Sequence, residues 1–301
     1  MPDFPARRIE QLGSKPKFWI GIDGLVPSRG LFKQTRSGTG EAWAERVSAD
    51  LAELLGLPHA LYDLAVYAQD EASTGGTSGV ISWTFRQSGE ALIHGNEILC
   101  AVVSDYPKAD GSRFRRIPAH TVDRVLGQCA TVRVPDPWEP VPPGIENAAD
   151  VMVGYLLFDA WIANTDRHDE NWGWIADPGV SLRLAPTYDH SSSLGRNEPD
   201  DRRAMKLRAT ALEHSVEGYA LRAPSGLYGE NGKQMRVIEA FRRAAQLRPA
   251  AASVWLGRLA RLAPTQWETA VARVPDDWIT PVARRFAIGI LSATRKHLLA
   301  P

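Results

Sequence analysis

Cysteine is scarce in this sequence, and long apolar segments are absent. The two cysteines, Cys100 and Cys129, are too few for a zinc site of four thiolates or for a disulfide framework. The longest apolar run covers residues 151–158 between Asp150 and Asp159, far short of the roughly 20 residues that a membrane span needs. We therefore expect no membrane segment, and we expect this run to form a buried helix.

Signals for secretion and an excess of charge are also absent. Residues 1–13 lack the apolar segment of a secretory signal, and no Asn-x-Ser/Thr glycan acceptor occurs. The 35 basic and 35 acidic residues give a formal net charge of zero at pH 7. A neutral chain is not typical of a polyanion binder, so we expect a cytoplasmic protein without direct contacts to nucleic acid.

Two common catalytic motifs do not occur either. No Gly-x-Ser-x-Gly turn is present, which excludes the serine hydrolases that carry their nucleophile there. No Gly-x4-Gly-Lys-Ser/Thr loop is present, which excludes the P-loop NTPases. What remains is a chain of 301 residues, 44% hydrophobic and 23% charged, a composition typical of a folded soluble protein. This length accommodates one large domain or two lobes that share a cleft.

The first part of the chain predicts a small lobe of strands and one helix. Residues 17–34 alternate short apolar runs with turn residues, so we expect two strands joined by a loop. Thr39 can cap a helix whose apolar residues recur at helical spacing. Further strands are expected within 60–69 and 79–85. We therefore assign residues 1–90 to an α+β N-terminal lobe.

The remainder of the chain, residues 91–301, predicts mostly helices. The apolar segment 144–164 gives the expected buried helix, and a strand pair within 171–175 and 182–189 follows it. Three further helical stretches are expected, from about 203 to 222, 233 to 262 and 265 to 299. The fold class is therefore α+β, with a mostly helical second lobe.

Acidic and amide side chains gather in the segment that follows the buried helix. Asp166 and Asn171 lie within NTDRHDENWG, and Asp189 ends the strand that returns after them. Phosphoryl transfer by kinases uses an aspartate, an asparagine and a second aspartate in this order. Asp166 would accept the proton of an attacking hydroxyl, while Asn171 and Asp189 would supply oxygen ligands to Mg²⁺.

A kinase also needs a strand lysine that holds the ATP phosphates and a helical glutamate that holds this lysine. Lys33 lies in the apolar run LFKQT, and Glu45 lies in the first turns of the expected helix. Glu41 is a second candidate for this ion pair. Because a carboxylate at a helix start is commonly a capping residue, we prefer Glu45.

Four segments, LFKQ, EAWAERVSADLAELLGLPHA, NTDRHDENWGW and APTYDHSSSLG, match the HipA-like serine/threonine kinases in order and spacing. The sequence resembles this family over roughly residues 17–200. The resemblance implies a two-lobed protein-kinase-like fold, related to phosphatidylinositol kinases, that transfers the γ-phosphate of ATP to a serine/threonine-type hydroxyl with Mg²⁺. It implies that Lys33 contacts ATP and that Asp166 is the catalytic aspartate. It also implies that Asn171 and Asp189 bind magnesium.

The same resemblance bears on the adenine site, on regulation and on partners. The adenine is expected at the hinge between the lobes, near Trp83 and Phe85. Ser28 lies in the loop before Lys33, where relatives autophosphorylate a serine that blocks ATP, although an ordinary turn serine is the alternative. A toxin–antitoxin role with an antitoxin-like partner is implied, but no residue identifies the phosphorylated protein or small molecule.

Some features differ from better-known kinases. Thr165 stands where eukaryotic-type kinases carry an arginine, which argues against activation by a phosphorylated loop, and His190 follows Asp189 in place of Phe-Gly. His168 is counted with the catalytic residues and is expected to fix the loop through hydrogen bonds, because no second histidine lies at zinc-ligand spacing. Since few residues precede the first strand, we expect a short form without the additional N-terminal subdomain of HipA toxins.

Two other functions stay open at this point. A metal-dependent hydrolase would be built on Asp166, His168, Asp169, Asp189 and His190. This alternative leaves Lys33 and Glu45 without roles. A kinase fold could also serve as a catalytically idle binding partner, although all four kinase positions are occupied by the required residue types.

Overall fold

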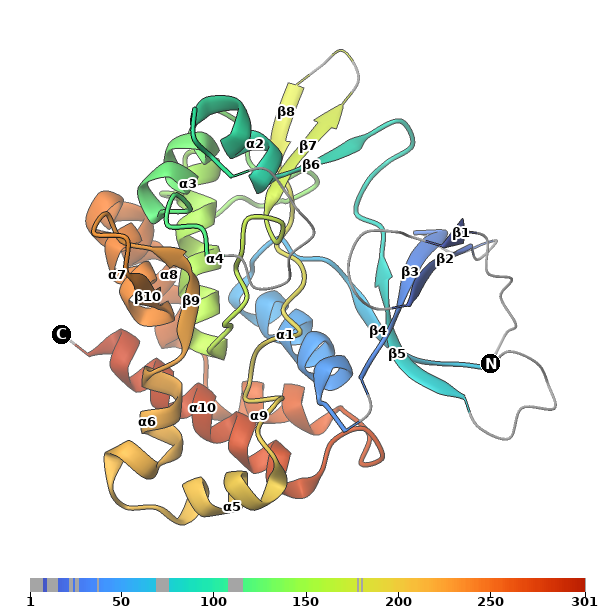
Figure 1. Cartoon of the computed structure of the whole chain (residues 1–301), viewed down its shortest axis with the longest axis vertical. Helices are drawn as coiled ribbons and strands as arrows, with labels where there is room; N and C mark the ends of the chain where they lie inside the picture. Colours follow the sequence, from blue (N-terminus) through green and yellow to red (C-terminus); the bar gives the residue numbers. More distant parts are fainter. Residues whose placement is uncertain are drawn as a thin grey trace.

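The computed structural model of the chain shows two lobes that lie side by side (Figure 1). An antiparallel sheet dominates the N-terminal lobe, and helices form most of the other lobe. Helix α1 (Glu41–Leu55) lies between them. The structure describes residues 8–9, 16–21, 24, 27–36, 38–68, 76–107, 116–177, 179 and 181–300.

The sheet of the N-terminal lobe has five antiparallel strands in the order β1-β2-β3-β5-β4. Their bounds are Arg8–Ile9 (β1), Lys17–Gly21 (β2), Arg29–Gln34 (β3), Tyr62–Tyr67 (β4) and Thr77–Trp83 (β5). The strands expected from alternating apolar runs, β2 to β5, are thereby confirmed. The helix expected between β3 and β4 is confirmed as α1.

The strand register separates the two faces of this sheet. Lys33 in β3 pairs with Val80 in β5, so both side chains point to the same face. Helix α1 covers this face, because its Ala49 packs in one apolar cluster with Val80 and Tyr62. Adjacent residues along each strand, such as Phe32, point to the other face. Lys33 therefore faces the helical lobe.

Helix α1 forms where apolar residues recur at helical spacing. The residues of its buried side include Trp43, Val47, Leu51 and Leu55. The helix ends at Gly56, whose φ of 74° is a left-handed value that glycine adopts without strain. Its start differs from the expectation, because the N-cap is Gly40 and not Thr39. The Thr39 hydroxyl instead donates to the carbonyl oxygen of Arg36, which closes the turn ahead of the helix.

The helices of the second lobe pack around α4 (Ala148–Ile162), in which every residue is buried. This confirms the helix expected from the apolar run. Helices α3, α7, α8 and α10 contact it. The remaining bounds are Gly95–Val102 (α2), Val122–Cys129 (α3), Asp200–Arg208 (α5), Val216–Leu221 (α6), Val237–Leu247 (α7), Pro249–Arg261 (α8), Pro264–Ala272 (α9) and Pro281–Leu299 (α10). Within the described residues, no helix combines the length and apolarity that a membrane span requires.

The last helical stretches are shorter than the sequence pattern predicts. The stretch expected at 233–262 is divided at Pro249, and the stretch expected at 265–299 is divided before Pro281. Proline has no backbone N–H, so it is tolerated in the first turn of a helix but not in its interior. Apolar periodicity continues across these positions, and only the prolines mark the breaks.

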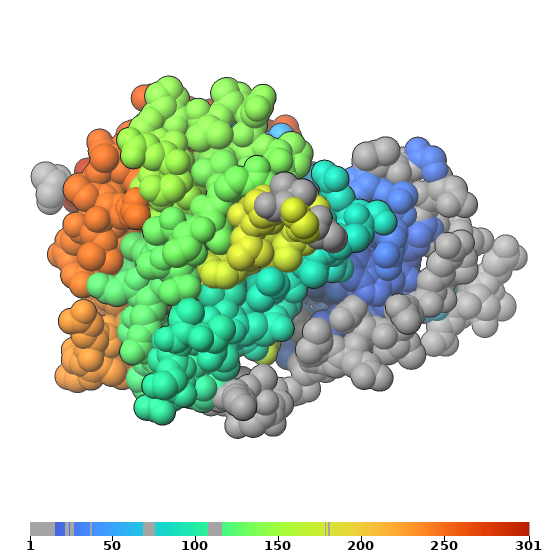
Figure 2. Space-filling view, turned by 90° about the horizontal axis from the view of Figure 1, so that it is seen from above, coloured from blue at the N-terminus to red at the C-terminus, as the bar shows by residue number. Residues whose placement is uncertain are grey.

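Two small sheets complete the fold. One contains β6 (Ala91–His94), β7 (Gly173–Asp177) and β8 (Ser181–Leu184) in this order. The other pairs β9 (Pro224–Tyr228) with β10 (Gln234–Arg236). Figure 2 shows the β7–β8 hairpin (yellow) against the segment of β6 and α2 (teal), beside the N-terminal lobe (blue). The loop that follows β8 therefore begins next to the junction of the two lobes.

Candidate active site

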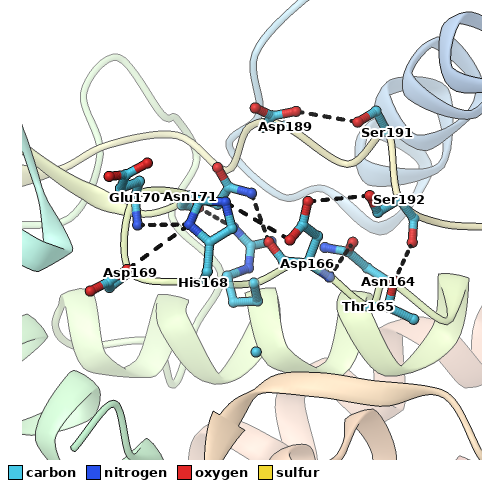
Figure 3. Close-up of polar contacts among 12 residues, drawn as sticks. Asn164, Thr165, Asp166, His168, Asp169, Glu170, Asn171, Asp189, Ser191 and Ser192 are labelled. Atoms are coloured by element: carbon cyan, nitrogen blue, oxygen red, sulfur yellow. Dashed lines mark hydrogen bonds and ion pairs between the residues drawn. The ribbon is translucent and has the colours of Figure 1, made fainter. Parts of the chain in front are cut away.

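The acidic segment after α4 forms a tight loop that side chains hold in place (Figure 3). Ala163 ends α4 in the left-handed conformation, with a φ of 52°. The Asn164 side chain then donates to Oδ1 of Asp159 (2.8 Å) and accepts from the backbone N–H of Asp166 (3.2 Å). Asn164 thus fixes the backbone of Asp166 relative to the central helix.

Asn171 and His168 flank Asp166. Nδ2 of Asn171 donates to the carbonyl oxygen of Asp166 at 2.7 Å, which leaves Oδ1 as the acceptor atom of the amide. Nδ1 of His168 accepts from the backbone N–H of Glu170 at 3.1 Å, so Nε2 carries the ring proton. That nitrogen lies 3.8 Å from Oδ1 of Asp166. The structure therefore brings these three candidate residues together in one loop.

Arg167 anchors this loop to the core. Its buried guanidinium makes a bidentate ion pair with Asp159, at 2.7 and 2.8 Å. It also donates to the carbonyl oxygen of Asn171 (2.6 Å), to Oγ1 of Thr187 (2.9 Å) and to Nε2 of His190 (3.1 Å). Burial, together with the charge of Arg167, lowers the pKa of His190 well below 6.5, so His190 is a neutral acceptor. Arg167 therefore joins the loop 164–171 to the segment that follows β8.

Asp189 stands in that segment with an uncommon backbone conformation. Its φ of 58° is a left-handed value, which aspartate adopts more readily than most residues. The Tyr62 hydroxyl accepts from its backbone N–H at 3.0 Å, and the Ser191 hydroxyl donates to its Oδ1 at 3.4 Å. Its Oδ2 lies 3.6 Å from Nζ of Lys33. The Asp189 carboxylate is thus directed toward the N-terminal sheet.

Glu45 lies in α1 and is almost completely buried. It accepts from the backbone N–H of His190 at 2.9 Å. Burial and the charge of Asp189 raise the pKa of Glu45 to about 7, although Lys33 acts in the opposite direction. Burial acts to lower the pKa of Lys33, but the carboxylates of Asp189 and Glu45 together raise it above 10.5. Among the described residues, Lys33 makes its ion pair with Asp189, and Glu45 acts on it through its charge.

Two other candidates lie outside this group. Glu41 forms ion pairs with Arg36 and Arg196 instead of Lys33. Ser28 is exposed immediately before β3, with no polar contact in the described part of the chain that joins it to the site. The geometry therefore favours Glu45 over Glu41 as the helical glutamate near Lys33.

Trp83 and Phe85, both expected near the adenine, have different surroundings. Trp83 shares the outer face of the sheet with Asp63, and its indole N–H donates to Oδ2 of Asp63 at 2.7 Å. Lys33 lies on the opposite face, because side chains alternate between the two faces along a strand. The placement of the adenine near Trp83 and Phe85 stays a prediction. The Phe85 ring stacks on Tyr188 at a centroid distance of 5.6 Å. Phe85 thus lies beside the segment that carries Asp189.

The carboxylates of the site fit a divalent cation. Burial and the charge of Asp189 raise the pKa of Asp166, against the opposing effects of His168 and the Ser192 hydroxyl. Excess negative charge is therefore concentrated here. The Asp189 carboxylate and the Oδ1 atom of Asn171 are the hard oxygen donors that Mg²⁺ prefers. They suit a metal held by two protein ligands together with phosphate oxygens.

The hydrolase alternative has less support. In the part of the chain that the structure describes, no three His, Cys, Asp or Glu side chains form a group that could hold a metal. His190 faces Arg167 and Thr187 in the core, and Asp169 accepts from the Tyr106 hydroxyl at 2.7 Å. The five residues of that alternative are therefore not assembled around one point.

Strand β9 supports the catalytic loop from a third side. A Cβ atom at Gly226 would lie 2.4 Å from the carbonyl carbon of Arg167 and 2.7 Å from the backbone nitrogen of His168, so glycine is required for this approach. The carbonyl oxygen of Gly226 also lies 2.9 Å from Nδ1 of the buried His120, whose Nε2 accepts from the Trp172 indole at 3.1 Å. The backbone of the loop therefore rests directly on β9.

Sequence reasoning missed two residues of this site. The Tyr62 hydroxyl contacts Asp189, and a hydrogen bond from it lowers the pKa of Glu45. In β4, residues two apart point to the same face, so Tyr62 lies on the same face as Leu64. This alternation is the sequence pattern from which its position could have been predicted. The Ser192 hydroxyl donates to Oδ2 of Asp166 at 3.2 Å, and no sequence pattern distinguishes it from the neighbouring serines.

Comparison with known proteins addresses the fold. No family model and no curated protein matches the chain. Among solved structures, the Helicobacter pylori proinflammatory kinase CtkA is similar with a TM-score of 0.74 and 14% identity, over 99% of this chain and 93% of that one. HipA of Shewanella oneidensis MR-1, solved as a toxin–antitoxin complex with HipB and operator DNA, has a TM-score of 0.56 and 14% identity, over 96% of this chain and 65% of its own. The chain thus spans less than two thirds of that HipA chain. At this identity the likeness shows the fold, and the expected two-lobed kinase-like fold is confirmed.

Proposed function

We propose that this protein is an ATP- and Mg²⁺-dependent kinase that transfers the γ-phosphate to a serine/threonine-type hydroxyl. The observation that carries the proposal is the ion pair between Lys33 and Asp189, 3.6 Å long, which joins the N-terminal sheet to the loop after β8. Asp166 and Asn171 lie in the adjoining loop. This is the set of groups that phosphoryl transfer requires, distributed over both lobes.

The charge and position of each residue indicate its role in the proposed reaction. Lys33 is a partly exposed cation that binds ATP phosphates, and the charges of Asp189 and Glu45 favour its charged form. Asn171 and Asp189 are the residues that would hold Mg²⁺, which supplies positive charge to the phosphate oxygens when bound. Asp166 accepts the proton of the incoming hydroxyl, and its raised pKa suits a general base.

The adenine is proposed to lie at the junction of residues 1–90 and 91–301, the two proposed domains. Phe85 and Tyr188 stack there. A buried ion pair between Glu90 and Arg183 (2.7 Å) fixes the connecting segment to the β7–β8 hairpin. This position lies beside Asp189, so a nucleotide there would reach Lys33 and Asp189 with its phosphates.

Regulation and partners complete the proposal. Ser28 is exposed immediately before β3, and its autophosphorylation would add negative charge that repels the phosphates of ATP. The HipA structure contains a second protein, HipB, and this supports an antitoxin-like partner for this chain as well. We place the protein in the cytoplasm, without direct contacts to nucleic acid, and its substrate is a protein or a small molecule with a hydroxyl group.

Thermal unfolding with nucleotide and metal tests the proposal. A ligand that binds only the native state stabilises it by about 2.7 kcal/mol at a hundredfold excess over its Kd. ATP with Mg²⁺ should therefore raise the melting temperature, and ATP with EDTA should raise it much less. Equal melting temperatures with and without millimolar Mg²⁺ and ATP would contradict the proposal.

A further inference from the structure

The Ser192 hydroxyl joins two charged groups on opposite sides. Its Oγ atom lies 3.2 Å from Oδ2 of Asp166 and accepts from the Arg196 guanidinium at 3.0 Å. A guanidinium has donors only, so the single proton of the hydroxyl is directed to Asp166. Figure 3 shows Ser192 pointing at the Asp166 carboxylate, while the neighbouring Ser191 points at Asp189.

Arg196 is held in turn by the start of α1. Its buried guanidinium forms an ion pair with Glu41 in the first turn of that helix. The backbone N–H of Gly40 donates to the carbonyl oxygen of Arg196 at 3.2 Å. Arg203 in α5 donates to the same carbonyl oxygen at 3.0 Å. The guanidinium that meets Ser192 is therefore fixed through its side chain and through its backbone.

The backbone around Ser192 is fixed as well. Its carbonyl oxygen accepts from the backbone N–H (3.1 Å) and from the hydroxyl (3.2 Å) of Thr165, the residue before Asp166. The next residue, Ser193, shares a hydrogen bond of 3.0 Å with Ser48 of α1. The turn at 191–196 thus contacts the catalytic loop through Ser192, and it contacts α1 and its N-cap through Ser193 and Arg196.

From this arrangement we propose that Ser192 is a positioning residue for Asp166, held by the Glu41–Arg196 ion pair at the start of α1. The inference rests on the proposed kinase function. Ser192 binds Oδ2 of Asp166 while His168 faces Oδ1, so the rotation of the carboxylate is set from both sides. A correctly rotated carboxylate matters for proton transfer from the hydroxyl and not for binding of ATP.

The test compares ADP formation from ATP and Mg²⁺ by the wild type and five variants, with bacterial lysate protein present as acceptor. Ser192→Ala removes the hydroxyl, and Ser192→Thr retains it. The control is Ser215→Ala, which removes a serine that also makes two hydrogen bonds, at the N-cap of α6 and away from the site. Melting temperatures show that each variant is folded.

We expect Ser192→Ala to lower kcat by about tenfold to a hundredfold, as for loss of a hydrogen bond to a charged group, with the KM for ATP within about twofold. Ser192→Thr should restore most of kcat. Glu41→Gln alone should lower kcat. Added to Ser192→Ala it should lower kcat little further, because the effects of substitutions within one hydrogen-bond network are not additive.

Three results would overturn the inference. The first is a Ser192→Ala variant whose kcat equals that of the control variant Ser215→Ala. The second is a Ser192→Ala variant that loses ATP affinity and kcat to the same degree. The third is a wild type that forms no ADP at all, which would overturn the proposed function and this inference with it, whereas the first two leave the proposed function intact.

Discussion

The Nζ atom of Lys33 lies 3.6 Å from Oδ2 of Asp189, and this ion pair joins β3 to the loop after β8. The side chains are 23% and 36% exposed, so phosphate and metal can reach both. Glu45 on α1 lies near this pair and accepts a hydrogen bond from the backbone N–H of His190, the residue after Asp189. The pair therefore marks the point at which the two lobes can bind one ligand together.

Removal of the Lys33 charge should weaken nucleotide binding. In Lys33→Met the ATP phosphates lose a charged hydrogen-bond donor, so we expect the Kd for ATP with Mg²⁺ to rise by about tenfold to a hundredfold. Lys233→Met, at an exposed lysine before β10, is the matched control. Calorimetric titration measures both, and equal affinities in the two variants would exclude Lys33 from the phosphate site.

The buried ion pair of Arg167 should be essential for stability. Arg167→Ala leaves the Asp159 carboxylate buried without its cation, which costs about 3–5 kcal/mol in comparable cases. Arg243→Ala breaks a solvent-screened pair with Asp123, so a much smaller loss of stability is expected. Urea unfolding of both variants gives the comparison. If Arg243→Ala costs as much as Arg167→Ala, burial is not what makes the Asp159 pair important.

His120 should make stability fall in mild acid. Its Nε2 accepts from Trp172 and burial is the main reason that its pKa is lowered, from 6.5 to about 4. Below pH 6.5 the unfolded chain therefore binds a proton at His120 that the folded protein does not, so stability decreases as the pH falls from about 6.5 to 4. His120→Gln lacks this titration and should show a shallower loss over this interval in urea unfolding. Parallel pH profiles for the two proteins would contradict the assignment.

Ser28 is expected to carry a self-catalysed phosphate. A phosphate adds about −1.5 to −2 charge and would repel the like-charged phosphates of ATP. Mass spectrometry of the wild type after incubation with ATP and Mg²⁺ should find phosphorylated Ser28, and Asp166→Asn should lack it. Phosphate on Ser28 in both proteins, or in neither, would remove self-regulation through this residue.

The sequence predicted those parts of the site that follow from local order. Lys33 lies within an apolar strand, and Asp166, Asn171 and Asp189 lie on the loops at either end of a strand pair. In each case the pattern of neighbouring residues predicts the strand or loop, and the strand or loop determines where the functional side chain lies. The central helix could be predicted for the same reason, since its apolar run continues through every turn.

Other parts depend on contacts between distant segments, which single-sequence patterns do not record. The side of the sheet on which Trp83 lies is set by its pairing with β3, and Asp63 then binds its indole. The hydrogen bond from Ser192 to Asp166 spans 26 positions, and the Arg196 pair with Glu41 spans 155. The first two contacts become visible only once each lobe is folded, and the third only once the two lobes are placed against each other.

The central claim assigns different work to two aspartates, and one calorimetric titration tests it. The wild type, Asp166→Asn and Asp189→Asn are each titrated with a non-hydrolysable ATP analogue and Mg²⁺. In the proposed function Asp189 holds the metal on the phosphates, so Asp189→Asn should lose most of the metal-dependent affinity. Asp166 faces the incoming hydroxyl, so Asp166→Asn should bind the analogue as the wild type does, while phosphate transfer falls by about 10² to 10⁴. No binding by the wild type, or binding that is lost in Asp166→Asn and kept in Asp189→Asn, would contradict the account.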